Sequence, residues 1–387
     1  MYYVGVDIAK SFHVASVIDD LGVIRVEAFS FNNNLQGFSI LLDALSPYSK
    51  EELIIGLEST AHYGEVFAQF FFKHGFKVAI VNPLQTSAIR KAGIRKTKTD
   101  KIDSFNVAKS LMFYGYTPLK KIDIDHLKLK SLAKTRRKLL KQQTTAKIQL
   151  VAYVDQIFPE LAKFFKNNLH IKTVQELLLQ HSSPSKISNI HLTKLSNLLI
   201  KASRGRYTKE DAKLLKILAK ESVGLDDSIL ELQIQMTIQQ IRLFSSQIDE
   251  VEKQSKEILE KLDSIILTVP GISYNAATAI LGILGDFKQF SSPKKIVAFA
   301  GLDPKVYESG NFKASSTRMS KRGNSLLRYH LIYTAYNLSL RNKTFKEYYN
   351  LKREQGKSHY NALGHVANKV IRVLYKIMTE DIPFNLS

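Results

Sequence analysis

Four carboxylates near the start of the chain have the residue types and the spacing of a metal-binding site. Asp7 lies inside an otherwise apolar strand, where an unpaired carboxylate would cost on the order of several kcal/mol. Glu58 ends a second apolar strand. Asp100 and Asp103 are three residues apart, so a helix would place both on one face, where they repel unless a cation lies between them. Together the four could hold two divalent ions at a phosphodiester.

Each of these acids also has an ordinary structural explanation. Asp100 and Asp103 could be first-turn helix residues favoured by the helix dipole, and Glu58 could cap the following helix. Asp7 is the hardest to explain in this way. The order of first strand, later strand and late helix favours the metal site. The chain has no cysteine, so oxygen ligands are expected, and these suit Mg²⁺ or Mn²⁺.

Basic residues surround the acidic motif. Six of the twelve residues from 90 to 101 are basic, namely Arg90, Lys91, Arg95, Lys96, Lys98 and Lys101. A second basic stretch runs from 128 to 147 and includes Lys134, Arg136, Arg137, Lys138 and Lys141. Such runs are usually solvated surface. Directly before two candidate metal ligands, the first favours a phosphate clamp, and the second suits backbone contacts with little base readout.

A serine near the C-terminus is the candidate nucleophile. Ser309 precedes Gly310, and a serine beside a glycine in a loop can expose its hydroxyl to a bulky substrate. Basic neighbours could stabilise the charge that develops on an attacked phosphate; they are Lys313, Arg318, Lys321 and Arg322. Ser-Gly is more often a structural turn, and Tyr307 and Ser320 are rival nucleophiles.

The elements that would position these residues form three regions. Strands are expected at 2–9, 12–19, 22–31, 52–58 and 77–82, and helices at 35–47, 61–74 and 100–114. Three strands joined as a meander and followed by alternating helices and strands predict a ribonuclease-H-like (RuvC-like) α/β domain at 1–118. An α-rich C-terminal domain is expected at 263–387, where Pro270-Gly271 indicates either a helix–hairpin–helix turn or an ordinary helical corner.

The middle region, 119–262, offers no strand candidate. Two long helical stretches flank a polar and less regular section at 165–225. The second stretch carries apolar residues at heptad spacing: Ile234, Ile238, Ile241, Ile248, Val251, Ile258 and Leu262. This spacing predicts a coiled-coil or oligomerisation arm, although a long helix of an ordinary bundle has the same pattern.

Composition narrows the partners. The 387 residues carry a formal net charge of +21, with 44% hydrophobic residues. Such a charge favours a polyanion, with nucleic acid the first expectation and a membrane surface the second. No apolar run approaches the ~20 residues that a spanning helix needs, and Met1 leads into no signal-peptide pattern. A cytoplasmic protein without a membrane partner is expected.

The chain resembles one known family, the bridge-RNA-guided insertion-sequence transposases with a RuvC-like DEDD domain and a serine-bearing C-terminal domain. The resemblance spans about 1–147 and 263–380, and about 150–230 is unmatched. The motifs that carry it, in the family's order, are Gly5-Val6-Asp7-Ile8-Ala9-Lys10, Leu57-Glu58-Ser59-Thr60, Asn82-Pro83, Lys98-Thr99-Asp100-Lys101-Ile102-Asp103-Ser104, Val269-Pro270-Gly271-Ile272, Phe299-Ala300-Gly301-Leu302-Asp303-Pro304, Tyr307-Glu308-Ser309-Gly310 and Met319-Ser320-Lys321-Arg322-Gly323-Asn324.

The resemblance implies a DNA transposase or recombinase. Asp7, Glu58, Asp100 and Asp103 would bind Mg²⁺, and Ser309 would attack DNA and become covalently joined to the strand end. A structured noncoding RNA from the same element would pair with donor and target DNA, so that base pairing sets sequence choice. Dimers would pair into tetramers, in a bacterial or archaeal cytoplasm and in association with the nucleoid.

Two other functions fit part of the sequence. A metal-dependent, junction-resolving nuclease would use the same carboxylates to activate water, and it explains 1–118 but leaves the Ser309 region without a role. A non-catalytic nucleic-acid-binding protein explains the positive charge but does not explain Asp7 inside an apolar strand.

Overall fold

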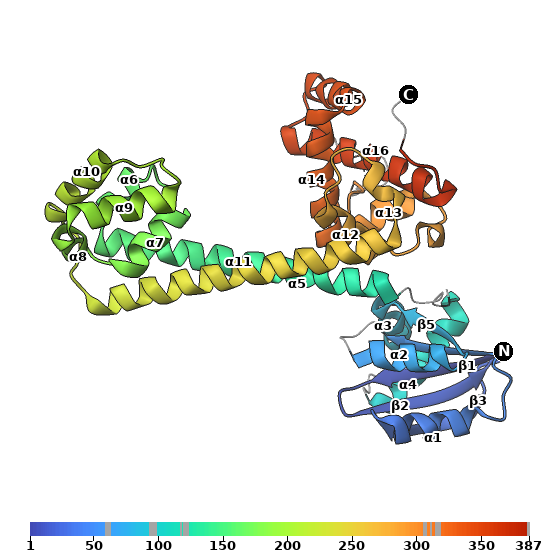
Figure 1. Cartoon of the computed structure of the whole chain (residues 1–387). Helices are drawn as coiled ribbons and strands as arrows, with labels where there is room; N and C mark the ends of the chain where they lie inside the picture. The colour runs from blue at the N-terminus through green and yellow to red at the C-terminus, as the bar shows by residue number, and fades with distance from the viewer. Residues whose placement is uncertain are drawn as a thin grey trace. The chain divides into compact units, whose positions relative to one another are not determined.

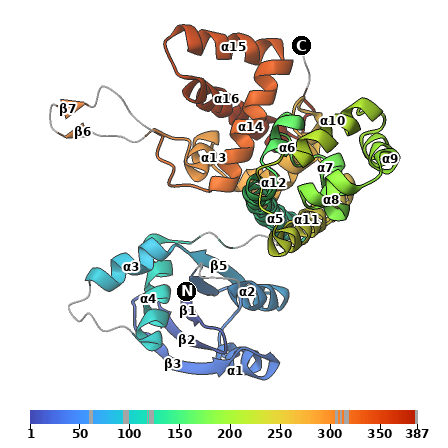
Figure 2. The ribbon, with the colours of Figure 1, turned by 90° about the vertical axis from the view of Figure 1, so that its left-hand side faces the viewer.

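A computed structural model describes most of the chain, which divides into two compact units, Met1–Asp123 and Ile124–Ser387 (Figures 1 and 2). The described residues are 1–58, 63–92, 99–116, 118, 124–304, 308–309, 312–313 and 319–384. The expected boundary at 262/263 lies inside the second unit. The division into three domains therefore stays a prediction.

The first unit contains a mixed five-stranded sheet in the order β3-β2-β1-β4-β5. The strands are β1 (Tyr2–Ile8), β2 (Phe12–Asp19), β3 (Ile24–Asn32), β4 (Leu53–Glu58) and β5 (Lys77–Val81). The first three form an antiparallel meander, and β4 and β5 run parallel to β1. This arrangement confirms the predicted meander followed by alternating helices and strands. The helices are α1 (Leu35–Leu45), α2 (Tyr63–Lys73), α3 (Pro83–Ala92), which the sequence analysis did not predict, and α4 (Asp100–Tyr114).

Helix α4 lies directly on the sheet because two strands carry glycine where it crosses them. A Cβ added at Gly5 would lie 2.0 Å from the carbonyl oxygen of Ser104, and one at Gly56 would lie 2.6 Å from Leu111 Cδ1. Tyr3, two residues before Gly5, packs against the cluster that contains Leu111. Helix α4 therefore runs antiparallel to β1, and its first turn lies at the carboxyl end of that strand.

Two long antiparallel helices, α5 (Ile124–Ile157) and α11 (Ser228–Leu262), run side by side in the second unit (Figure 1). Polar side chains join them along their length, with Arg136 donating to Glu252 at 2.6 Å and Gln143 to Ser245 at 2.8 Å. The heptad residues Ile234, Ile238, Ile241 and Ile248 of α11 are buried. The seam therefore packs within one chain, while a supercoiled arm stays a prediction.

Residues 160–220 form five helices, so the expectation of a less regular section there was wrong. The helices are α6 (Glu160–Phe164), α7 (Lys172–Gln180), α8 (Pro184–Asn189), α9 (Leu192–Ser203) and α10 (Lys209–Lys220). Their core includes the fully buried Leu177, Leu195 and Leu215. Each helix is short, so its apolar periodicity extends over few turns and is hidden by the polar caps between helices, such as the Thr208–Asp211 capping box of α10.

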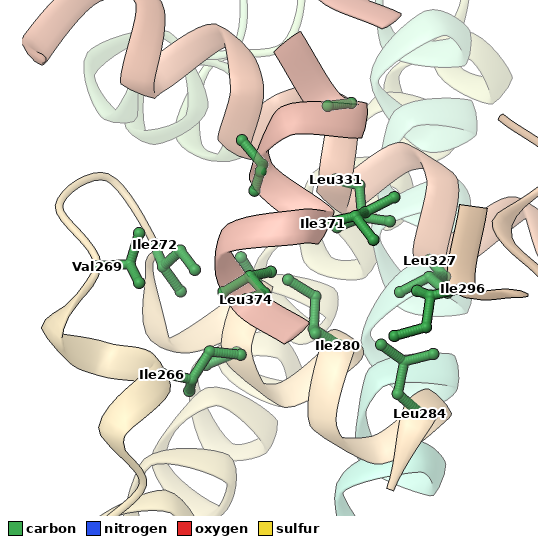
Figure 3. Packing of buried hydrophobic residues seen from close by; sticks show 14 of the residues in the cluster. Ile266, Val269, Ile272, Ile280, Leu284, Ile296, Leu327, Leu331, Ile371 and Leu374 are labelled. Atoms are coloured by element: carbon green, nitrogen blue, oxygen red, sulfur yellow. The ribbon is translucent and has the colours of Figure 1, made fainter. Parts of the chain in front are cut away.

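The remaining helices share a second core (Figure 3). They are η1 (Ile265–Thr268), α12 (Tyr274–Leu284), η2 (Phe287–Gln289), α13 (Pro293–Ala300), α14 (Ser325–Arg341), α15 (Lys343–Glu354) and α16 (His359–Glu380). Val269 and Ile272, on either side of Pro270-Gly271, are buried in this core. This burial favours the ordinary helical corner over a DNA-binding hairpin. Among the described residues, no helix has the length and apolar character needed to cross a membrane.

Candidate active site and nucleic-acid interface

Asp7 and Glu58 lie at the carboxyl ends of neighbouring parallel strands. The register of β1 and β4 pairs Val6 with Leu57, and the two acids are the next residues along each strand. Side chains alternate between the faces of a strand, so Asp7 shares the face of Gly5, and Glu58 that of Gly56. Both acids therefore point to the α4 side of the sheet, and both are half-buried.

Helix α4 brings the other two acids to the same end of the sheet. Thr99 caps the helix by accepting a hydrogen bond from Ile102 N, so Asp100 and Asp103 fall in its first turn. Asp103 is 7% exposed, whereas Asp100 is exposed. Arg90, from the last turn of α3, lies with Nη2 2.8 Å from Asp103 Oδ1. This ion pair offsets the cost of burying the Asp103 carboxylate.

The chemistry of this donor set suits a hard divalent cation, because carboxylate oxygens are the ligands that Mg²⁺ prefers. Within the part of the chain that the structure describes, however, no three acidic or histidine side chains are placed so that they could hold an ion. Asp103 is instead neutralised by Arg90, which the sequence analysis had assigned to nucleic acid. The metal role of the four acids therefore stays a prediction.

The other basic residues of the 90–101 stretch are partly described. Lys91 is exposed at the end of α3, and Lys101 is exposed in the first turn of α4. Arg95, Lys96 and Lys98 lie outside the described residues. Their expected contact with nucleic acid is therefore a prediction.

The segment that carries the candidate nucleophile begins and ends in a paired stem. Residues 299–304 and 319–324 are joined by backbone hydrogen bonds, including Asn324 N to Phe299 O at 2.8 Å and Ser320 N to Asp303 O at 2.8 Å. Gly301 and Gly323 make this pairing possible, since a Cβ on Gly301 would lie 2.6 Å from Gly323 N. The stem leads directly into α14, whose first turn is capped by Asn324.

Ser309 lies in a short hairpin beyond this stem. Strands β6 (Glu308–Ser309) and β7 (Phe312–Lys313) pair antiparallel, with Ser309 opposite Phe312. The side chain of Ser309 is outside the described residues, as are Tyr307 and Arg318. The rival Ser320 is described, and its hydroxyl donates to Asp303 Oδ1 at 2.6 Å. Lys321 and Arg322 are exposed in the stem.

The second basic stretch lines a shallow groove with a volume of about 470 Å³, called here the basic groove. Its lining residues are Lys134, Arg137, Lys138 and Lys141 of α5, Ile283 of α12, and Asn324, Ser325 and Leu326 at the start of α14. The four cations recur at intervals of three, one and three residues, which places them on one helical face. All four belong to the second basic stretch that the sequence offered for backbone contacts, but their shared helical face was not predicted.

Two neighbouring arginines on α5 have different surroundings. Arg137 Nη1 donates to Ser325 Oγ at 3.1 Å, which ties the basic groove to α14. Arg136, predicted with it as a nucleic-acid contact, is turned toward α11 and is paired with Glu252 at 2.6 Å. The structure therefore brings Arg137 and Lys138 to the basic groove and does not place Arg136 in its lining.

His330, on α14, lies near Arg136 and Arg137 of α5. Burial, followed by the positive charges of Arg136 and Arg137, lowers its pKa to about 4. Because the pKa of His330 in the fold lies below the usual histidine value of 6.5, the unfolded chain binds the proton more readily below pH 6.5. The stability from the neutral imidazole is complete above that pH and is lost as the pH falls toward about 4.

Replacing His330 with glutamine should remove this pH dependence. Between about pH 7 and about pH 5, wild type should lose roughly 2 kcal/mol more unfolding free energy than His330→Gln, because a pKa difference of one unit corresponds to about 1.4 kcal/mol. Urea titrations of both proteins at the two pH values measure the difference. Equal losses in the two proteins would show that His330 titrates normally in the fold.

Two protein-family models match the chain. One, described as a DEDD transposase, matches residues 4–159 and so contains all four candidate acids. The other, described as the transposase of the IS116/IS110/IS902 family, matches residues 263–350, which include Ser309 and the stem. The chain carries the transposase domains of the IS110/IS116 family. Helices α6 to α11 lie between the two matched ranges.

Two of three similar proteins align over nearly all of this chain, and the third aligns over less than half of it. The pilin gene-inverting protein of Moraxella lacunata is 25% identical over 387 residues, covering 99% of this chain and 97% of that protein. The insertion element IS110 protein of Streptomyces coelicolor is 21% identical, covering 98% and 94%. The transposase of insertion sequence IS1111A from Coxiella burnetii is 30% identical over 168 residues, covering 42% and 46%.

Among solved structures, T. thermophilus RuvC in complex with a Holliday junction substrate aligns with 31% of this chain and 99% of its own. The sequence identity is 14% and the TM-score is 0.25. A TM-score this low supports no argument about the fold. The description of the first unit therefore depends on the strand order of its own sheet.

Proposed function

We propose that this insertion-sequence transposase cuts and rejoins DNA through a covalent serine intermediate and is directed to its sites by an RNA from its own element. The observation that carries the proposal is the pairing of two features in one chain. One is a DEDD transposase domain with Asp7, Glu58 and Asp103 at one end of one sheet face. The other is a second transposase domain that holds a serine on a stem-bound hairpin.

The proposed reaction divides between the two domains. Asp7, Glu58, Asp100 and Asp103 would hold Mg²⁺, which when bound stabilises negative charge on a phosphodiester. Ser309 Oγ would bond to phosphorus as the bond to the leaving sugar oxygen breaks, and the serine proton would leave as that oxygen gains one. The phosphoserine bond keeps the energy of the broken bond, so rejoining requires no ATP. The sequence has no Gly-x-x-x-x-Gly-Lys-Ser/Thr nucleotide-binding motif.

An RNA guide would explain how such a protein selects DNA. The surfaces on which the proposal depends are basic and lie along helix faces, which suits backbone contact more than base readout. In RNA-guided recognition the protein reads shape and charge, and base pairing supplies the sequence. Donor and target DNA would each pair with a different part of the RNA.

Protein purified from cells that carry the whole element should therefore contain one abundant noncoding RNA encoded beside the gene. Sequencing the copurified nucleic acid tests this, with protein from cells that lack the flanking DNA as the control. Protein freed of RNA by nuclease should lose target choice and regain it when the transcript is added. RNA-free protein that still selects its target would contradict the guided mechanism.

Self-association is supported by an apolar stripe on the outer face of α11. Ile229, Leu232, Met236 and Leu243 are 60%, 52%, 52% and 55% exposed. Their spacing of three, four and seven residues places them on one face, opposite the buried heptad seam. A second copy of the same stripe would cover these side chains, and such dimers could pair into tetramers.

Glutamate at Leu232 and Met236 should weaken self-association, because burying two carboxylates against an apolar partner is strongly unfavourable. The dissociation constant should rise at least about 100-fold, as measured by sedimentation equilibrium. Leu351→Glu is the matched control, since Leu351 is 46% exposed on α15, away from the stripe. An unchanged dissociation constant for the double variant would exclude this face as the interface.

A further inference from the structure

Helix α14 presents a row of exposed aromatic side chains that the proposed function does not use. Tyr329, Tyr333 and Tyr336 are 59%, 46% and 40% exposed, and Leu340, one turn further, is 61% exposed. Intervals of four, three and four residues place all of them on one face of the helix. The rings of Tyr329 and Tyr333 are nearly parallel, with centroids 6.2 Å apart and planes at 11°. This set of side chains is called the tyrosine stripe.

The opposite face of α14 is anchored in the core. Leu327, Leu331 and Leu338 are fully buried, and Figure 3 shows the first two among side chains from the surrounding helices. The helix is therefore fixed in its rotation, and the tyrosines face solvent because of that packing. A contiguous apolar surface on a helix so firmly held is typical of a binding site.

The tyrosine stripe continues the basic groove. Ser325 and Leu326, which line the groove, lie four and three residues before Tyr329 on the same helix. The four cations of α5 therefore lie at one end of a surface whose other end is aromatic. A cationic groove leading onto a row of aromatic rings is the combination that proteins use to bind single-stranded nucleic acid without sequence preference.

We propose that the basic groove and the tyrosine stripe together bind single-stranded DNA, with phosphates at Lys134, Arg137, Lys138 and Lys141 and bases stacked on Tyr329 and Tyr333. The choice of DNA over RNA rests on the proposed function, in which this domain breaks a DNA strand. A duplex fits less well, because its bases are already stacked on each other. A second copy of the chain also fits less well as the ligand, because its four groove cations would be brought against the same four cations of the first copy.

The test separates stacking from charge by comparing two fluorescent probes of the same length. One is an oligothymidylate of about 12 nucleotides, and the other is an abasic strand with the same number of phosphates. The full-length wild type should bind the oligothymidylate at least about tenfold more tightly. Replacing Tyr329 and Tyr333 together with leucine should weaken oligothymidylate binding about 10- to 100-fold and leave abasic binding unchanged.

Three further variants serve as controls. Tyr329→Phe with Tyr333→Phe keeps both rings and should keep the preference, which separates stacking from a folding defect. Tyr114→Leu removes a tyrosine that is 52% exposed at the end of α4 and should change neither affinity. Lys138→Gln should weaken both probes and reduce the slope of log affinity against log salt by about 0.7, whereas the tyrosine variants should keep that slope.

Three results would overturn the proposal. One is a tyrosine-to-leucine double variant that still prefers oligothymidylate over the abasic strand. Another is a double variant that loses affinity for oligouridylate alone, which would make RNA the ligand. The third is a tyrosine-to-leucine double variant whose DNA binding is unchanged but whose molecular mass in solution is altered, which would make the stripe a protein interface. Because binding requires no cleavage, a chain that binds as expected but does not recombine would count against the proposed function only.

Discussion

Replacing Ser309 with alanine should abolish recombination while leaving RNA and DNA binding unchanged. Without the hydroxyl no bond to phosphorus can form, and loss of a nucleophile typically lowers turnover by a factor on the order of 10⁴ or more. The backbone of Ser309 lies in the β6–β7 hairpin beyond the Gly301–Gly323 stem, and alanine is compatible with a strand. Recombination of a donor and target plasmid pair, beside electrophoretic mobility shifts, measures the two properties separately.

Ser320→Ala is the decisive comparison for this prediction. Ser320 lies in the stem, and its hydroxyl is hydrogen-bonded to Asp303 at 2.6 Å, so its removal should weaken the stem rather than the chemistry. A strand end covalently attached to wild type should be recovered after denaturation and should map by mass spectrometry to Ser309. If Ser320→Ala removes that adduct and Ser309→Ala keeps it, the nucleophile is Ser320. If strands are cut with no adduct on any residue, a water-using nuclease is the better description.

Replacing Asp7 with asparagine should stop strand cleavage and leave the fold intact. The side chains are of nearly equal size, but the neutral amide removes one of two adjacent strand-end carboxylates, and with it half of the negative charge that Asp7 and Glu58 supply. The cleavage rate should fall at least about 1,000-fold, in the range seen when one charge-stabilising group is lost. Single-turnover cleavage of a labelled donor, with circular dichroism as the folding check, measures this effect.

Asp7 is a cleaner test than Asp103, although Asp103→Asn should also stop cleavage. Asp103 is paired with Arg90 at 2.8 Å, so its replacement would also leave a half-buried guanidinium without its carboxylate. Asp43→Asn is the matched control for Asp7, because Asp43 is exposed on α1 in the same unit. Chelation of divalent ions with EDTA should reproduce the defect in wild type. Full cleavage in EDTA would exclude the metal.

Local chemistry and periodicity were enough to predict much of this protein. Short runs of mostly apolar residues in 2–9, 12–19 and 52–58 predicted the strands of the sheet, since such runs are typical of strands buried on both faces. The heptad spacing in 234–262 predicted a long helix with one buried face for the same reason. Asp7 within an apolar strand, together with the motifs around Asp100 and Ser309, was enough to indicate a transposase family from the sequence.

Contacts between residues far apart in the sequence could not be predicted from local chemistry and periodicity. Only the folded chain pairs Arg90 with Asp103, turns Arg136 toward Glu252 while Arg137 joins Ser325, and sets four lysines and arginines beside the start of α14. Each of these depends on how two helices far apart in the sequence pack and rotate against each other. The rotation of each helix follows from many buried contacts together, such as those that α4 makes with β1 at Gly5. No single stretch of sequence specifies all of these contacts.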